Sequence, residues 1–268
     1  MKALLDDELW HLIEPILPQP KPRRFRDPGR RPLSNRQCLT GVMYVLTTGI
    51  PWEYLPREMG CGSGVSCWRR LRDWQQQGIW KKLHRLLLNR LRHADRIDFS
   101  RALVDSSSVR AVFGGTQTGP SPVDRRKNGS KHHLLTDARG VPLATIITGA
   151  NRHDVTQLLP LVRAVPPIAG KMGRPRRRPD QLQGDRAYDS KPHRKALRAL
   201  GIKPILAKRN TPHGSGLGVY RWVVERTIAW LHQFRRLRTR CEKRILMHRA
   251  FVHLACALIC WNCLKCSF

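Results

Sequence analysis

Apolar residues recur at helical spacing through the first 95 residues of the chain. In "DDELWHLIEPIL" the apolar positions follow a helical period behind an acid pair, which is typical of a helix start. After a Pro/Arg-rich linker over residues 18–32, "SNRQCLTGVMYVLTTG" predicts a helix from a capping Ser34 to Gly49. Three more helices are expected, in "PWEYLPREMG", "VSCWRRLRDWQQQG" and "IWKKLHRLLLNRLRHA". Residues 1–95 therefore predict an all-α domain.

Two of these expected helices are joined by the glycine-containing stretch "CGSG", and the second of them is basic. On that second helix Trp68, Leu71 and Trp74 share one side, and the arginines fall largely on other faces. This pattern fits a helix-turn-helix that contacts DNA, with a solvated face of an ordinary helical bundle as the alternative. The candidate DNA-contacting residues are Arg69, Arg70 and Arg72.

The hydrophobic pattern changes near residue 98, where runs with strand character begin. "SRALVDSSSV" predicts a short strand that ends in Asp105, and residues 113–130 predict a loop or flap. "KHHLLTD" and "VPLATIITG", joined by "DARG", predict a hairpin. Helices then alternate with two strands, in "QLQGDRAYDS" and "IKPILAK", before a loop in "NTPHGSGLG", a helix from about Val219 and a last helix over 245–264. Residues 96–268 therefore predict an α/β domain with a sheet flanked by helices.

Charge adds a partner to this picture. The chain has 50 Lys and Arg against 19 Asp and Glu, a formal net charge of +31, which favours a polyanion such as double-stranded DNA. No uninterrupted apolar run of about 18 residues is present, so we expect no membrane-spanning helix and no membrane partner. The N-terminal "MKALLDDELWHLIEP" has no apolar signal core, and we expect a cytoplasmic protein.

Four of the eight cysteines lie in "CALICWNCLKC" near the C-terminus. The surrounding pattern is a continuous apolar helix without a Gly or Pro turn, whereas a zinc knuckle needs a turn between its ligands. We therefore favour reduced cysteines packed in the core over a zinc site.

Three carboxylates stand at chemically informative places. Asp105 ends the first expected strand, Asp185 ends the fourth in "GDRAYDS", and Glu225 lies at the edge of the buried side of the helix after the fifth. If the first and fourth strands are neighbours, the two aspartates project side by side and repel each other unless a cation lies between them. Hard divalent ions prefer such oxygen ligands, and two of them support phosphoryl transfer. Arg221 lies one helical turn before Glu225, and a simple ion pair between the two is the alternative.

Other polar residues compete with this set. We assign Asp189 to a helix cap, Asp137 to the hairpin turn and Asp154 to the first turn of a helix. His153 follows a strand end and could reach the site, so its role stays open. The loop "GRPRRRP" predicts either a minor-groove-reading arm or a solvated basic loop. Its arginines are Arg174, Arg176, Arg177 and Arg178.

Five segments together carry a resemblance to a known family. The blocks "LVDSSSVRA", "GSKHHLLTDARGVPLA", "TGANRHD", "GDRAYDS" and "YRWVVERTIAWLHQFRRLR" resemble those of insertion-sequence transposases of the IS5 group, within the larger IS4-like set. The resemblance implies a DDE transposase with a ribonuclease-H-like catalytic domain, in which Asp105, Asp185 and Glu225 are the catalytic, metal-binding acids and Arg221 contacts DNA. The chain departs from the wider pattern where Gly218 replaces a Tyr, with Tyr220 displaced, and where His232 replaces a Lys; Tyr220 and His232 are the corresponding candidates for DNA contacts.

The resemblance also implies an activity and its partners. We expect binding to the terminal inverted repeats of an insertion sequence, metal-dependent DNA cleavage and strand transfer. Two Mg²⁺ ions are expected, with Mn²⁺ as a substitute, in a homodimer or larger synaptic assembly on DNA in the bacterial nucleoid. A catalytically inactive DNA-binding repressor and a metal-dependent nuclease of the same fold remain alternatives.

Overall fold

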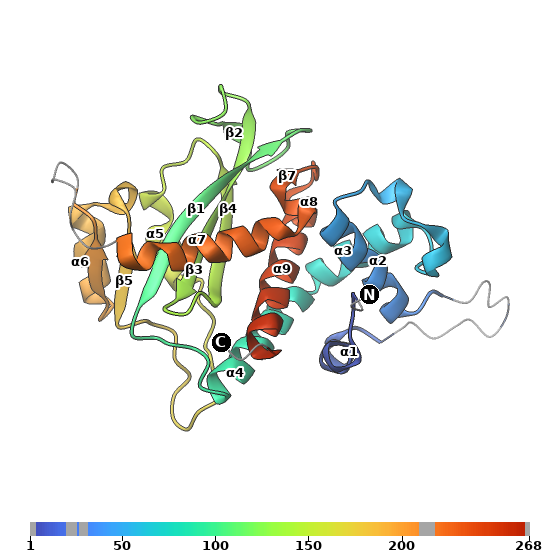
Figure 1. Ribbon diagram of the computed structural model, residues 1–268, viewed down its shortest axis with the longest axis horizontal. Helices are drawn as coiled ribbons and strands as arrows, with labels where there is room; N and C mark the ends of the chain where they lie inside the picture. The colour runs from blue at the N-terminus through green and yellow to red at the C-terminus, as the bar shows by residue number, and fades with distance from the viewer. Residues whose placement is uncertain (1–3, 20–25, 27–31, 209–217, 266–268) are drawn as a thin grey trace.

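The computed structural model describes residues 4–19, 26, 32–208 and 218–265. Figure 1 shows a mixed sheet with helices on both faces, beside a bundle of helices from the two ends of the chain. The expected loop "NTPHGSGLG" and most of the Pro/Arg-rich linker lie outside the described residues.

The N-terminal region is helical, as predicted. It contains α1 (Asp7–Ile13), α2 (Asn35–Thr48), α3 (Gly64–Gln76) and α4 (Ile79–His93). A capping box between Ser34 and Gln37 starts α2, and Gly49 ends it with a φ of 78°.

The expected helix in "PWEYLPREMG" is wrong. This segment forms two 3₁₀ helices, η2 (Trp52–Tyr54) and η3 (Arg57–Met59). Pro51 and Pro56 precede them and lack the backbone N–H groups that a continuous α-helix would need. Residues 49–63 therefore join α2 to α3 as an irregular connection rather than as a tight turn between two α-helices.

The strands and helices of the sheet region follow one another along the chain in the order that the sequence predicts. Its five main strands are β1 (Ala102–Ala111), β3 (Asn128–Asp137), β4 (Pro142–Gly149), β5 (Gln181–Gly184) and β6 (Lys203–Leu206). They run in the order β4-β3-β1-β5-β6, with β3 antiparallel to both neighbours and β5 and β6 parallel to β1. This is a ribonuclease-H-like arrangement. The two-residue strands β2 (Gly119–Pro120) and β7 (Thr239–Arg240) extend the sheet at β3 and β1.

Helices cover both faces of this sheet. The helix α7 (Gly218–Gln233) crosses one face against β1 and β3, and α5 (Val155–Arg163) packs on β3 and β4 from the other, next to α6 (Lys191–Ala199). The one-turn helix α8 (Arg235–Arg238) follows α7 and leads to α9 (Ile245–Lys265). The α/β class of the second region is therefore confirmed.

The last helix, α9, joins the two parts of the molecule. It packs against α4 and α3 on one side and against α7 and β4 on the other. One continuous cluster of buried apolar residues runs from Leu9 in α1 through Trp80 in α4 and Phe251 in α9 to Leu135 in the sheet. The boundary between residues 95 and 96 stays a prediction, because this core is shared.

By length and composition α9 could cross a membrane, a property that the search for an uninterrupted apolar run missed. Within the fold, 72% of its most apolar stretch is buried, so its apolar character fits a central core helix. Cys256, Cys260 and Cys263 are buried along it and form no disulfide, as predicted for reduced core cysteines, and Cys266 lies outside the described residues.

Candidate active site

Asp105 and Asp185 lie at neighbouring positions of two parallel strands. Ala102 of β1 pairs with Leu182 of β5, and Leu103 pairs with Gln183. Continued by two residues, the same register places Asp105 opposite Asp185. The condition that the two strands are neighbours is therefore met, and the strands bring the two aspartates together.

The expectation that β1 ends at Asp105 is wrong. The strand continues to Ala111, and it pairs with β3 as far as Arg110. The apolar pattern stops at Asp105 because three serines follow it, but the backbone ladder does not need apolar side chains. Asp105 therefore lies inside a strand that is hydrogen-bonded beyond it, which holds its backbone more firmly than a strand end would.

Gly184 makes the close approach of these strands possible. A Cβ atom at this position would lie 2.9 Å from the Cγ1 atom of Val104 and 3.2 Å from the Cδ2 atom of Tyr188. Any side chain at residue 184 would push β5 away from β1, directly beside both aspartates. Asp185 then leaves the strand, and its carboxylate accepts the N–H of Ala187 at 2.9 Å.

Glu225 faces this pair from α7, through Arg221. The Arg221 Nε atom lies 2.9 Å from the Glu225 Oε1 atom, and another Arg221 nitrogen lies 4.0 Å from the Asp105 Oδ2 atom. The Glu225 side chain is 52% exposed and the Asp105 side chain 15% exposed. The ion pair between Arg221 and Glu225 is therefore real, and it belongs to the same cluster as the aspartates.

The environment raises the pKa of Asp105 to about 6. Burial is the main cause, and the nearby negative charges of Asp185 and Glu225 act in the same direction. The N–H of Ser106, 2.8 Å from the Asp105 Oδ1 atom, and the Arg221 guanidinium partly oppose this rise. Mutual repulsion of this kind among three carboxylates is what a bound cation relieves.

The donor chemistry of the cluster fits a divalent cation. Three carboxylates supply hard oxygen ligands, and the nearly buried Asp105 carries an unfavourable charge without a cation. Among the described residues no three His, Cys, Asp or Glu side chains converge closely enough to hold an ion. Arg221 occupies the space between Asp105 and Glu225, so convergence requires the Glu225 side chain to leave it.

A polar network on the other face of β1 was missed by the sequence analysis. The Ser106 hydroxyl donates to the Asp154 Oδ1 atom at 2.7 Å, and the Lys131 Nζ atom lies 3.0 Å from the same oxygen. Asp154 lies at the start of α5, as predicted, but its side chain makes no cap there, because its carboxylate is bonded to the nearby lysine and serine. In the sequence, the block "TGANRHD", which ends in Asp154, was the feature that could have indicated this network. The network anchors the residue next to Asp105.

The other polar residues that were weighed against the acid set, Asp137, Asp189 and His153, lie outside the acid cluster. The Asp137 carboxylate accepts the N–H groups of Arg139, Val141 and Asp98 in the hairpin turn, as predicted. Asp189 is not a cap, because Ser190 starts α6; it pairs with Arg194 at 2.8 Å instead. His153 is exposed at the turn before α5.

The predicted DNA-contacting arginines of α3 have different surroundings. Arg69 is exposed. Arg70 donates to the Asn35 Oδ1 atom at 2.7 Å, and Arg72 pairs with Asp73 at 2.8 Å while it lies over the Trp68 ring. Arg69 is therefore the best placed of the three for an external partner.

The arginines of the loop "GRPRRRP" also differ in their surroundings. Arg174 and Arg177 are exposed. Arg176 pairs with Asp180 and lies over the Phe99 ring, and Arg178 donates to the Leu200 carbonyl at 3.0 Å.

Tyr220 and His232 lie at opposite ends of α7. Tyr220 is 46% exposed, and the Arg101 guanidinium lies 3.6 Å from its ring centre, close to the Arg221 end of the site. The Nε2 atom of His232 is buried, and its ring lies 6.5 Å from that of His132. Burial, helped by the charge of Arg238, lowers the pKa of His232, and the exposed Arg238 donates to the His232 carbonyl at 2.7 Å.

Residues 98–260 match the family described as "Transposase DDE domain". The chain belongs to the DDE transposases. Residues 5–84 of this transposase match a second family, described as "Putative transposase of IS4/5 family". The two matches cover both the helical region and the sheet region.

Curated relatives of the transposase come from insertion elements. The protein described as "Putative transposase for insertion sequence element IS402" from Burkholderia cepacia is 59% identical over 171 residues, which are 64% of this chain and 80% of the relative. The "Insertion element IS402 uncharacterized 16.2 kDa protein" from the same organism is 65% identical over 121 residues, 45% of this chain and 82% of the relative.

Solved structures with a partial likeness are those of the Mos1 transposase. The catalytic domain of Mos1 mariner transposase is 13% identical, with a TM-score of 0.28 over 70% of this chain and 93% of that one. The Mos1 strand transfer complex is 13% identical, with a TM-score of 0.28 over 88% of this chain and 79% of that one. The ribonuclease-H-like assignment rests on the strand order rather than on these low-scoring superpositions.

Proposed function

We propose that this DNA transposase belongs to the IS5 group, binds the terminal inverted repeats of its insertion sequence, cuts the DNA at their ends and joins the freed end to target DNA. The observation that supports this most strongly is the parallel pairing of β1 with β5, the register of which continues to Asp105 and Asp185, while Glu225 shares Arg221 with Asp105. Acids on separate elements are thus gathered at one place, next to exposed arginine.

As a DDE transposase, the protein uses divalent metal ions. We expect two Mg²⁺, with Mn²⁺ as a substitute, held by Asp105, Asp185 and Glu225. Bound ions of this kind supply Lewis-acid activation of the attacking oxygen and stabilisation of the leaving oxygen. Within the chain, β1 and β5 fix the positions of the two aspartates. Arg221, once it leaves Glu225, is free to neutralise a DNA phosphate beside the cut.

The DNA contacts follow from charge and exposure. The formal net charge of +31 favours DNA over the whole surface, and Arg69, Arg174 and Arg177 are exposed. We assign recognition of the inverted repeats to the N-terminal helices. Because two ends must be held together, we expect a homodimer or larger synaptic assembly, working in the cytoplasm on the bacterial nucleoid.

The test uses a DNA fragment with the inverted repeats that flank the gene. With Mg²⁺ or Mn²⁺ the wild-type protein should cut the repeat ends and join them to a second duplex. Asp185→Asn should bind the fragment with unchanged affinity and lose at least 10³-fold in cutting, because one metal-binding carboxylate is gone. Asp95→Asn is the matched control: Asp95 is an exposed aspartate with a φ of 56°, which asparagine tolerates well.

Three outcomes contradict the proposal. Equal cutting by wild type and Asp185→Asn removes the acid assignment. Cutting without joining identifies a nuclease of the same fold. Binding without cutting by the wild-type protein, at any divalent ion concentration, identifies a repressor.

A further inference from the structure

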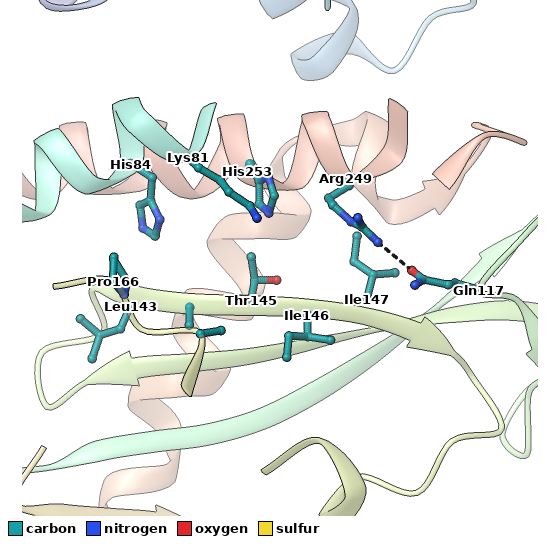
Figure 2. A pocket seen from close by; sticks show the side chains of 12 residues that line it. Lys81, His84, Gln117, Leu143, Thr145, Ile146, Ile147, Pro166, Arg249 and His253 are labelled. Carbon is teal, nitrogen blue, oxygen red and sulfur yellow. Dashed lines mark hydrogen bonds between the residues drawn. The ribbon is translucent and has the colours of Figure 1, made fainter. Parts of the chain in front are cut away.

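A pocket lies at the β4 edge of the sheet, two strands away from β1 and its acids (Figure 2). It encloses about 360 Å³ between β4, α4 and α9, and this volume lies within the range of small-ligand pockets. β3 separates β4 from β1, so at the usual spacing of strands the pocket is roughly 10 Å from Asp105 across the sheet. It is therefore a separate place from the proposed active site.

Charged and imidazole side chains from two helices line this pocket, and the Gln117 amide and the Thr145 hydroxyl complete its polar lining. Arg249 donates to the Gln117 Oε1 atom at 3.3 Å, the hydrogen bond drawn in Figure 2, and a bound anion would share or replace this bond. Lys81 and His84 come from α4, and Arg249 and His253 come from α9; Figure 2 shows their side chains above the outer edge of β4. No Asp or Glu occurs among the described residues that line it. Two cations without a carboxylate between them give the pocket a positive potential.

Two buried polar atoms in the pocket lack a partner among the described residues. They are the Oγ1 atom of Thr145 on β4 and the Nδ1 atom of His253. His253 is only 9% exposed, and a buried polar atom without a partner destabilises the fold. His84 differs, because its Nε2 atom is 2.7 Å from the Pro142 carbonyl and donates to it. Thr145 and His253 are therefore available to a ligand that brings oxygen atoms.

We propose that this pocket binds a phosphate group, with Lys81 and Arg249 supplying charge and Thr145 and His253 supplying hydrogen bonds. Tetrahedral oxyanions suit this set because charge-assisted bonds from Lys and Arg to phosphate oxygens are strong. The phosphate is either a phosphodiester of DNA that passes over the β4 edge or a free phosphomonoester. The site is independent of the cleavage chemistry proposed above.

The histidine provides a spectroscopic reporter. Burial, helped by the charges of Lys81 and Arg249 nearby, lowers the pKa of His253 to about 3, so its ring is neutral at pH 7. A phosphate oxygen that accepts a hydrogen bond from the ring changes the electronic environment of the imidazole directly, which moves the ring resonances in an NMR spectrum.

The experiment titrates the full-length protein with three probes: inorganic phosphate, thymidine 5′-monophosphate and the dinucleotide TpT. The only phosphate group of TpT is the phosphodiester that links its two nucleosides. Heat of binding and the His253 resonances are recorded. The double variant Lys81→Gln/Arg249→Gln should weaken saturable binding at least tenfold, because charged hydrogen bonds contribute about 1.5–3 kcal/mol each. Lys82→Gln is the matched control, since Lys82 is the exposed neighbour that does not line the pocket.

A second variant guards against misfolding. Thr145→Val keeps the shape and charge of the pocket and removes one hydroxyl, and it should weaken binding several-fold while the far-UV spectrum stays unchanged. Binding of TpT as well as the monoester indicates DNA as the source of phosphate, and binding of the monoester and inorganic phosphate alone indicates a free ligand. The proposal is overturned if no probe binds saturably, or if Lys82→Gln weakens binding as much as the double variant. No cleavage is measured, so either result leaves the acid assignment untouched.

Discussion

Arg221 lies where the charges of two carboxylates meet. Its guanidinium is bonded to Glu225 and within 4.0 Å of Asp105, so in the absence of other cations it offsets part of their repulsion. At half exposure an ion pair of this kind contributes at most about 1 kcal/mol, which a divalent ion or a phosphate easily replaces. The residue therefore stabilises the acids at rest without blocking their use.

The raised pKa of Asp105 predicts that this acid destabilises the fold at neutral pH. The carboxyl group has a pKa of about 6 in the fold against an ordinary value of 3.8. The penalty is absent below pH 3.8, appears as pH rises toward 6 and is complete above it, at about 3 kcal/mol. Asp105→Asn should therefore melt several degrees higher than wild type at pH 8 without divalent ions, and the gain should shrink toward zero near pH 4. Asp95→Asn serves again as control; a lower melting temperature for Asp105→Asn at pH 8 would contradict the argument.

Metal binding should reverse this difference. A divalent ion that binds only the folded protein stabilises it by about 2.7 kcal/mol at a concentration 100 times its dissociation constant. Mg²⁺ or Mn²⁺ should therefore raise the melting temperature of wild type at pH 8 and leave Asp105→Asn and Asp185→Asn nearly unchanged. The effect should fade below pH 6, where Asp105 becomes protonated. Equal stabilisation of all three proteins would place the ions elsewhere.

At the scale of elements, the end of α7 decides which arginines surround Glu225. Helical periodicity predicts that Arg236 shares a face with Glu225, but α7 ends at Gln233 and Phe234 adopts an extended backbone with a ψ of 100°. Arg236 then turns into the protein, pairs with Glu242 at 2.7 Å and donates to the Ile50 carbonyl at 2.9 Å. Arg240 is also fully buried. These two arginines stabilise the fold, and their guanidinium groups are not available to contact DNA phosphates.

Arg236→Met should cost about 3–5 kcal/mol in the free energy of unfolding, because it leaves Glu242 buried without its partner. Urea denaturation measures this cost, with Arg235→Met at an exposed neighbouring position as the control. The double change Arg236→Met/Glu242→Gln should recover part of the loss. If the single change costs less than about 1 kcal/mol, the pair of Arg236 with Glu242 does not stabilise the fold in the way that its burial indicates.

Hydrophobic periodicity predicted most elements, because a strand or helix with one apolar face repeats its apolar residues in the sequence at a characteristic spacing. It failed where polar groups are paired by tertiary contacts. The serines after Asp105 gave no apolar signal for the second half of β1. The place of Asp154 at the start of α5 was predicted, but its bonds to Lys131 and Ser106 depend on the tertiary fold. The acids of the site were predictable because each lies in or next to a strand or helix that the sequence pattern reveals. The position of Arg221 between Asp105 and Glu225 was not predictable, because it depends on side-chain packing. The same is true of the pocket beside β4.

At the scale of the molecule, the shared core gives the basic surface a rigid support. The helices α3 and α4 pack on α9, which also packs on β4 and α7. A DNA contact made on the N-terminal helices is thus transmitted to the sheet region through buried apolar side chains rather than through a flexible linker. The orientation of the bound DNA end relative to the acids follows from this packing.

The net charge predicts strongly salt-dependent DNA binding. A protein that neutralises six to ten phosphates loses roughly 10³–10⁵ in affinity between 50 and 200 mM salt, and a formal net charge of +31 should place this chain in that regime even on unrelated DNA. Arg69→Gln and Arg177→Gln, at exposed positions, should each reduce the slope of log affinity against log salt by about 1. Fluorescence anisotropy across a salt series measures it. A slope unchanged in both variants would exclude these arginines from the interface.

The pairing of β1 with β5 also governs which insertions and deletions the gene tolerates. The distance between the two aspartates is set by a short parallel ladder and not by the stretch of chain that joins them, so loops between residues 112 and 180 can lengthen without moving either carboxylate. A one-residue deletion between Ala102 and Asp105 has the opposite effect, because successive strand side chains point to opposite faces and the carboxylate would turn toward α5. A frame-preserving insertion of three nucleotides in a loop between residues 112 and 180 is therefore tolerated, whereas a frame-preserving deletion of three nucleotides between Ala102 and Asp105 inactivates the protein.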